Sequence, residues 1–206
     1  MNLLTHIVKS DKSVGECVVS LHQFDDKYQT DYEVTSIDDV PELNASNYIP
    51  RGMTALLDAI GKTINELGES LENIPEDDRP DTVIVAILTD GYENASEEYR
   101  LKDIKKLIIH QCEVYNWEFI FLGAGQDAIA TAAQLSIEQD NAMTYTANDQ
   151  GTRAAFRSMS AGINRKRMSK RHVYEKGGDY KAAIRASHNT ETFTDQDRKE
   201  QEDADI

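Results

Sequence analysis

The chain has 206 residues, with 22 basic and 37 acidic side chains and a formal net charge of −15. This length allows one domain plus a tail, and the strong negative charge argues against nucleic acid or an anionic membrane as the main partner. The two isolated cysteines form neither a disulfide framework nor a zinc-ligand spacing, and no apolar run suits a signal peptide or a membrane span, so we expect a cytoplasmic protein.

The first predicted elements form a hairpin. Residues 17–24 are expected to be a strand, and Asp25, Asp26 and Lys27 form an acidic turn after it. In the next strand the residues Tyr28, Thr30, Tyr32 and Val34 alternate with polar ones. A period of two with one wet face indicates an antiparallel strand at the edge of a sheet.

A helix is predicted after Thr54. Apolar residues recur there at the spacing that places them on one side of a helix, so this helix should bury a single stripe. The stripe consists of Leu56, Leu57, Ile60, Ile64, Leu67 and Leu71.

The apolar run at residues 83–88 stops at Asp90 and Gly91. Uninterrupted runs of this kind are typical of parallel strands that are covered on both faces. Asp90 would then lie at the carboxyl end of the strand, where open α/β sheets bind ligands, and it is a candidate metal contact. The alternative is that Asp90 and Gly91 only form the turn into the next helix.

From residue 83 to residue 164 the predicted strands and helices alternate, which favours a parallel sheet. Asn94, with Glu97 three residues later, indicates a helix start. Further strands are expected at 117–122 and 142–146, with a short helix between them and a longer helix from Asp149 to residue 164. Beyond residue 164 the sequence turns basic and then acidic, with few apolar residues. We expect residues 165–206 to be a disordered polar tail, with a transient helix at 174–186.

The sequence from Arg51 to Ile60, together with Leu88 to Gly91, resembles the von Willebrand factor type A (VWA) domain family, in particular its bacterial and phage cytoplasmic members. The resemblance covers about residues 17–164. It implies an α/β fold with a doubly wound, mostly parallel sheet, helices on both faces and one antiparallel edge strand. The segments that carry it are Arg51-Gly52-Met53-Thr54-Ala55-Leu56-Leu57-Asp58-Ala59-Ile60 and Leu88-Thr89-Asp90-Gly91.

The resemblance also implies a metal site. In this family a metal-ion-dependent adhesion site binds Mg²⁺ or another divalent cation at the carboxyl edge of the sheet. Thr54 matches the threonine of its second loop, and Asp90 matches the aspartate of its third loop. Hydroxyl and carboxylate oxygens suit such a hard cation. The alternative role for Thr54 is that of a helix N-cap, which needs no metal.

The sequence departs from the family at its beginning. The Asp-x-Ser-x-Ser loop that follows the family's first strand is missing, and residues 1–16 are expected to be the remnant of the first helix, as in an N-terminally truncated domain. With only Thr54 and Asp90 left, a bound Mg²⁺ should keep most of its waters and bind weakly. The strands at 17–24 and 83–88, which the missing strand would separate, are expected to pair directly.

The resemblance implies a protein-binding module rather than an enzyme, and members of this kind often act beside AAA+ ATPases. One alternative is a degenerate, metal-free domain with a regulatory or scaffolding role. Another is a nucleotide-binding α/β protein that uses Gly123-x-Gly125-x-x-Ala128, although small residues here more simply permit a tight strand-to-helix turn. The scattered histidines provide no candidate catalytic group.

Overall fold

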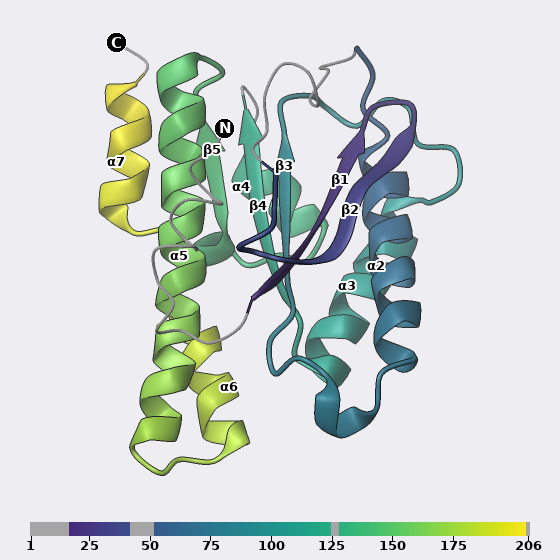
Figure 1. Ribbon diagram of the computed structural model, residues 1–206. Coiled ribbons are helices and arrows are strands. Elements are labelled where there is room, and N and C mark those ends of the chain that lie inside the picture. Colours follow the sequence, from purple (N-terminus) through teal and green to yellow (C-terminus); the bar gives the residue numbers. More distant parts are fainter. Residues whose placement is uncertain (1–16, 42–51, 125–127, 205–206) are drawn as a thin grey trace.

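The computed structural model describes residues 17–41, 52–124 and 128–204. Figure 1 shows a layer of strands with helices packed beside it. The principal elements in the described ranges are β1 (Val18–Phe24), β2 (Tyr28–Ser36), α2 (Leu56–Glu72), β3 (Ile84–Thr89), α3 (Leu101–Tyr115), β4 (Glu118–Ala124), α4 (Ala128–Gln134), β5 (Ala142–Tyr145), α5 (Asp149–Glu175), α6 (Tyr180–His188) and α7 (Asp195–Asp203).

A parallel sheet forms the centre of the fold. Its strand order is β3-β4-β5, so that β4 lies in the middle. Ile84 pairs with Glu118 at one end of β3, and Thr89 pairs with Gly123 at the other. The predictions of an α/β fold and of parallel strands in this half of the chain are therefore confirmed.

Alternating residues of the sheet belong to two separate cores. Phe119 and Phe121 join a cluster with apolar residues of α2, α3 and α4. Ile120 and Leu122 join a second cluster that includes residues of α5. Neighbouring side chains of a strand point to opposite faces, and the two clusters cover both faces of β4. Every residue of β4 is therefore buried, which explains the nearly continuous apolar run at this point of the sequence.

The predicted hairpin is present, but it does not join the parallel sheet. β1 and β2 pair antiparallel and form a two-stranded sheet of their own. The prediction that the 17–24 strand pairs directly with the 83–88 strand is therefore wrong within the described residues. The hairpin contacts α2 instead. The Tyr28 hydroxyl lies 3.0 Å from Thr63 Oγ1 and donates to Glu66 at 2.9 Å.

The C-terminal region also differs from the prediction. Residues expected to form a disordered tail continue α5 as far as Glu175 and then form α6 and α7. Few apolar residues hold these helices, but Phe193 is buried among the residues of the second core. Polar contacts supply the rest: Arg198 on α7 donates to the carbonyl of Ala142 at 2.9 Å, and Gln201 accepts from the backbone N–H of Thr146 at 3.2 Å.

The expected helix remnant at residues 1–16 lies outside the described residues. None of the helices in the described part of the chain combines the length and the apolar character that a membrane crossing requires.

Candidate functional site

The loop that follows β3 is longer than the sequence suggested. Asn94 and Glu97 were expected to begin a helix, but α3 begins only at Leu101. The intervening residues form an irregular loop whose polar groups are bonded to the start of α2. The structure thereby brings residues 90–99 against residues 54–58.

Thr54 is attached to this loop through its backbone. Its N–H donates to Asn94 Oδ1 at 2.9 Å, and its carbonyl accepts from the N–H of Asn94 at 3.0 Å. This pair of bonds explains why Asn94 does not cap a helix: its side-chain oxygen already serves Thr54. Two hydrogen bonds to one residue fix the position of Thr54 relative to the loop.

Gly91 lies directly beside the Thr54 side chain. A Cβ atom at position 91 would clash with Thr54 Oγ1, so a larger residue fits there only if Thr54 moves. The Thr89 hydroxyl donates to the carbonyl of Gly91 at 3.1 Å and so helps to hold this turn. The structure therefore places Thr54 against the residue that follows Asp90, at the carboxyl end of β3.

The Thr54 hydroxyl does not cap α2. The N-cap position is Ala55, and no side chain caps the helix. Thr54 is only 9% exposed, and its hydroxyl makes no hydrogen bond with any of the described residues. The alternative role of Thr54 as an N-cap is therefore wrong.

Asp90 is exposed at the end of β3. Its carboxylate makes no hydrogen bond or ion pair within the part of the chain that the structure describes. The two residues that the sequence singled out thus lie on neighbouring segments, and each has an oxygen that is not engaged elsewhere in those segments.

The backbone amides at the start of α2 are already in use. Ala55 donates to the carbonyl of Asp25 at 2.7 Å, Leu57 to Glu93 Oε2 at 2.9 Å, and Asp58 to Ser96 Oγ at 3.1 Å. A helix N-terminus often binds an anion through such groups. Here these three amides serve the protein itself, so an acidic ligand would find little support from them.

Asp58 belongs to the segment Arg51–Ile60 that carries the family resemblance, and it has a structural role. Its carboxylate accepts from the backbone N–H groups of Glu97 at 2.9 Å and Tyr99 at 2.8 Å. Burial raises the pKa of Asp58, but these bonds together with that of Glu98 outweigh burial and hold the pKa below its usual value. Asp58 ties the loop to α2 and is not available as a metal ligand.

Sequence reasoning overlooked Asp25. This residue follows β1 as Asp90 follows β3, and it is 4% exposed. Its Oδ1 atom accepts from the backbone N–H of Lys27 at 2.6 Å. An aspartate directly after a strand was the signal used for Asp90 and could equally have identified Asp25, which was interpreted only as part of an acidic turn.

Within the described residues, no group of three or more histidine, cysteine, aspartate or glutamate side chains is arranged to hold a metal ion. A cation at Thr54 and Asp90 would therefore take few protein ligands and many waters. The alternative nucleotide site cannot be followed in full, because residues 125–127 lie outside the described residues. Gly123 belongs to β4, and Ala128 begins α4.

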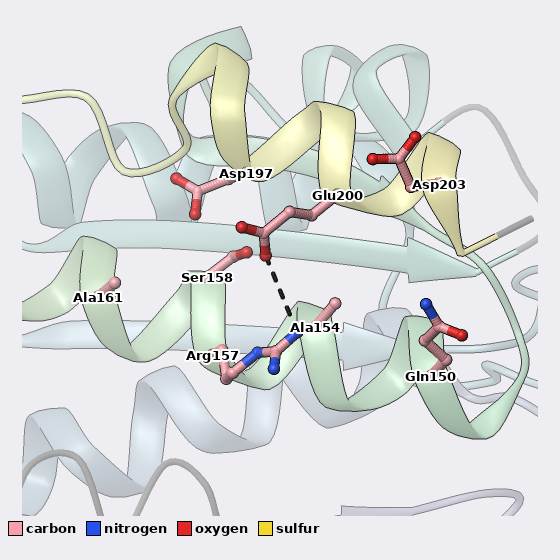
Figure 2. Close-up of a pocket in the computed structure, with 8 residues that line it drawn as sticks. All are labelled: Gln150, Ala154, Arg157, Ser158, Ala161, Asp197, Glu200 and Asp203. Carbon is pink, nitrogen blue, oxygen red and sulfur yellow. Dashed lines mark ion pairs between the residues drawn. The ribbon is translucent and has the colours of Figure 1, made fainter.

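A separate hollow of about 560 Å³ lies between α5 and α7 (Figure 2). Arg157 and Glu200 approach each other across it, with 3.9 Å between Nη2 and Oε2. Both side chains are about half exposed, so this ion pair contributes little to stability. The hollow contains neither Thr54 nor Asp90; its lining is Gln150, Ala154, Arg157, Ser158, Ala161, Asp197, Glu200 and Asp203.

Comparison of the chain with protein-family models, with curated proteins and with solved structures gave no match.

Proposed function

We propose that this protein is a VWA-like binding module with a doubly wound sheet, in which a divalent cation such as Mg²⁺ lies between Thr54 and Asp90 and binds an acidic side chain of a protein partner. The resemblance suggests an AAA+ ATPase as one class of partner. The observation that carries the proposal is the closeness of the Thr54 hydroxyl to Gly91, the residue that follows Asp90 at the carboxyl end of β3. A hard cation accepts both hydroxyl and carboxylate oxygens.

The electrostatics of the site support a cation rather than direct binding of an acidic partner. Asp90 is exposed, the carboxylate of Glu93 lies in the same loop, and the whole chain carries a net charge of −15. These charges repel a second carboxylate, and the neighbouring amides of α2 are occupied. A divalent cation reverses the local charge and supplies free coordination positions, because Mg²⁺ usually keeps several waters that a partner oxygen can replace.

Isothermal titration of the protein with Mg²⁺ and with Mn²⁺ tests this proposal. We expect weak binding, because only two protein oxygens are offered and the cation would keep most of its waters. Thr54→Ala and Asp90→Ala should each abolish the heat. Asp77→Ala is the matched control, since Asp77 is an exposed aspartate in the short turn after the far end of α2. Equal binding by the Asp90 variant and the control would contradict the proposed site.

A metal-free module is the second candidate, and the small number of ligands at the site favours it. In that case the same titration gives no heat with either cation. Any partner would then bind identically in Mg²⁺ and in EDTA.

A further inference from the structure

The last strand of the parallel sheet is bordered by a helix instead of by another strand. Within the described residues β5 pairs only with β4, and the outer edge of such a strand carries backbone groups that need other partners. At that edge the carbonyl of Ala142 accepts from Arg198 Nη1 at 2.9 Å. The N–H of Thr146, directly after β5, donates to Gln201 Oε1 at 3.2 Å. Two side chains of α7 therefore make hydrogen bonds that a neighbouring strand would make.

The later turns of α7 are held by polar contacts and have little apolar packing. Gln201 is the buried residue of α7, and its Nε2 atom donates to the carbonyl of Gly151 at 3.2 Å. Towards α5, the hollow of about 560 Å³ lies between the two helices (Figure 2). The first turn is anchored separately, because Arg165 and Asp197 form an ion pair at 2.8 Å. The later turns thus cover the edge of β5 without belonging to either apolar core.

The edge groups that α7 covers are complementary to each other. Backbone groups of every second residue point to the same edge of a strand, so Ala142, Thr144 and Thr146 share the outer edge. In an antiparallel pair centred on Thr144, the carbonyl of Ala142 in one copy faces the N–H of Thr146 in the other. The acceptor and the donor that α7 occupies are thus the groups through which two copies would bond each other. Such a two-fold contact is the commonest arrangement in homodimers.

We propose that the later turns of α7 are a cover that keeps the outer edge of β5 from pairing with a second copy of this chain. When these turns leave the edge, the two β5 strands pair antiparallel, with Thr144 opposite Thr144 of the second copy, and one sheet runs through both copies. The Thr144 side chain is exposed, so it does not obstruct a strand at this edge.

Reversing the polarity of both α7 contacts tests this inference on the full chain. The double variant Arg198→Glu, Gln201→Lys places an acceptor against the Ala142 carbonyl and a donor against the Thr146 N–H, so neither bond can form. We expect the wild-type chain to be a monomer and this reversed variant to be a dimer. Light scattering after size-exclusion chromatography should show the mass doubled, at an ionic strength that screens the negative charge of the chain.

Position 144 tests the register of the two strands. In the reversed variant, Thr144→Lys places two positive charges opposite each other, and Thr144→Asp places two negative charges there. Each protein alone should be a monomer, because like charges directly opposite destabilise a strand pair. An equal mixture of the two should form a mixed dimer. Both changes remove the same hydrogen bond, from the Ala128 N–H to the Thr144 hydroxyl at 3.3 Å, so its loss cannot explain dimerisation of the mixture alone.

The double variant Gln196→Lys, Lys199→Glu is the matched control, since it makes the same kinds of charge change at exposed positions of α7, and it should stay a monomer. Slow amide exchange in β4 shows that the sheet is intact. A reversed variant that keeps this slow exchange and stays a monomer would overturn the inference. A dimer that position 144 does not affect, or a wild-type dimer, would overturn it too, because the copies would then meet elsewhere. Loss of slow exchange in β4 would mean that α7 is part of the folding core rather than a cover.

Discussion

The change Glu118→Gln tests whether a buried charge cluster holds the C-terminal helices to the sheet. Glu118 begins β4, and its Oε2 atom lies 2.8 Å from the Nζ atom of Lys166. The other carboxylate oxygen lies 3.7 Å from the Nζ atom of Lys170. None of the three side chains is more than 5% exposed, and the Ser187 hydroxyl also donates to the carboxylate. The cluster thus joins β4, α5 and α6.

Glutamine keeps the size of the side chain but removes its charge, which leaves two ammonium groups without their buried counter-ion. Removing one partner of a buried pair typically costs about 3–5 kcal/mol, so we expect a loss of this size in the free energy of unfolding, measured by urea denaturation near neutral pH. Glu113→Gln changes an exposed residue of α3 and should cost less than about 0.5 kcal/mol. The additional change Lys166→Met in the Glu118→Gln background should recover part of the loss.

The pH dependence gives an independent check. Burial raises the pKa of Glu118, but Lys166, Ser187 and Lys170 together lower it below its usual value. A carboxyl group whose pKa is lower in the folded state stabilises the protein above the unfolded pKa, and this contribution disappears as the pH falls through the folded pKa. Glu118→Gln should therefore reduce the loss of stability in acid. A variant that costs no more than Glu113→Gln, with an unchanged acid profile, would refute the reasoning.

Three further predictions concern the loop after β3. Gly91→Ala places a Cβ atom against Thr54 Oγ1 and should cost about 1–3 kcal/mol by urea denaturation; adding Thr54→Ala should restore most of it, and no restoration would mean that the two residues do not meet. Asn94→Ala removes the acceptor for the Thr54 N–H and should cost about 1 kcal/mol, whereas Asn94→Asp keeps the acceptor and should cost clearly less; equal losses would exclude this bond as the cause. Asp58→Asn weakens the acceptor of the backbone amides of residues 97–99, so the free energy of unfolding should fall. The stability should also become less sensitive to acid, because the pKa of Asp58 is lowered in the folded state. An unchanged acid profile would count against this role of Asp58.

Local patterns in the sequence were sufficient for the strands and for most helices. The apolar run before Asp90 reflects the surroundings of a single element, so it predicted β3 closely. The period of two at Tyr28–Val34 predicted that β2 is a strand, but not that Thr30 and Val34 are exposed. The loop after β3 could not be predicted in this way. Asn94 has the local pattern of a helix cap, but its side chain bonds Thr54, which is 40 residues away in the chain.

The same limit explains the errors at the C-terminus. Lys166 and Lys170 lie in the segment for which the local pattern predicts a disordered tail, because their common counter-ion, Glu118, lies in a distant strand. A glutamate at the start of an otherwise apolar strand was the one available signal, since a buried charge requires a partner. At the candidate site, the strand end and the family resemblance predict Thr54 and Asp90 as candidates, whereas the attachment of residues 93–99 to α2 required the structure.

The residues around Thr54 differ in how their side-chain oxygens are used. Asn94, Glu93 and Asp58 all use their side-chain oxygens to join the loop to α2, and their role is to position the segments. The oxygens of Thr54 and Asp90 have no such use within the described residues. Because two protein oxygens can hold a cation only weakly, metal coordination alone would give low affinity for a partner. Most of the binding energy for a partner should then come from contacts other than the cation.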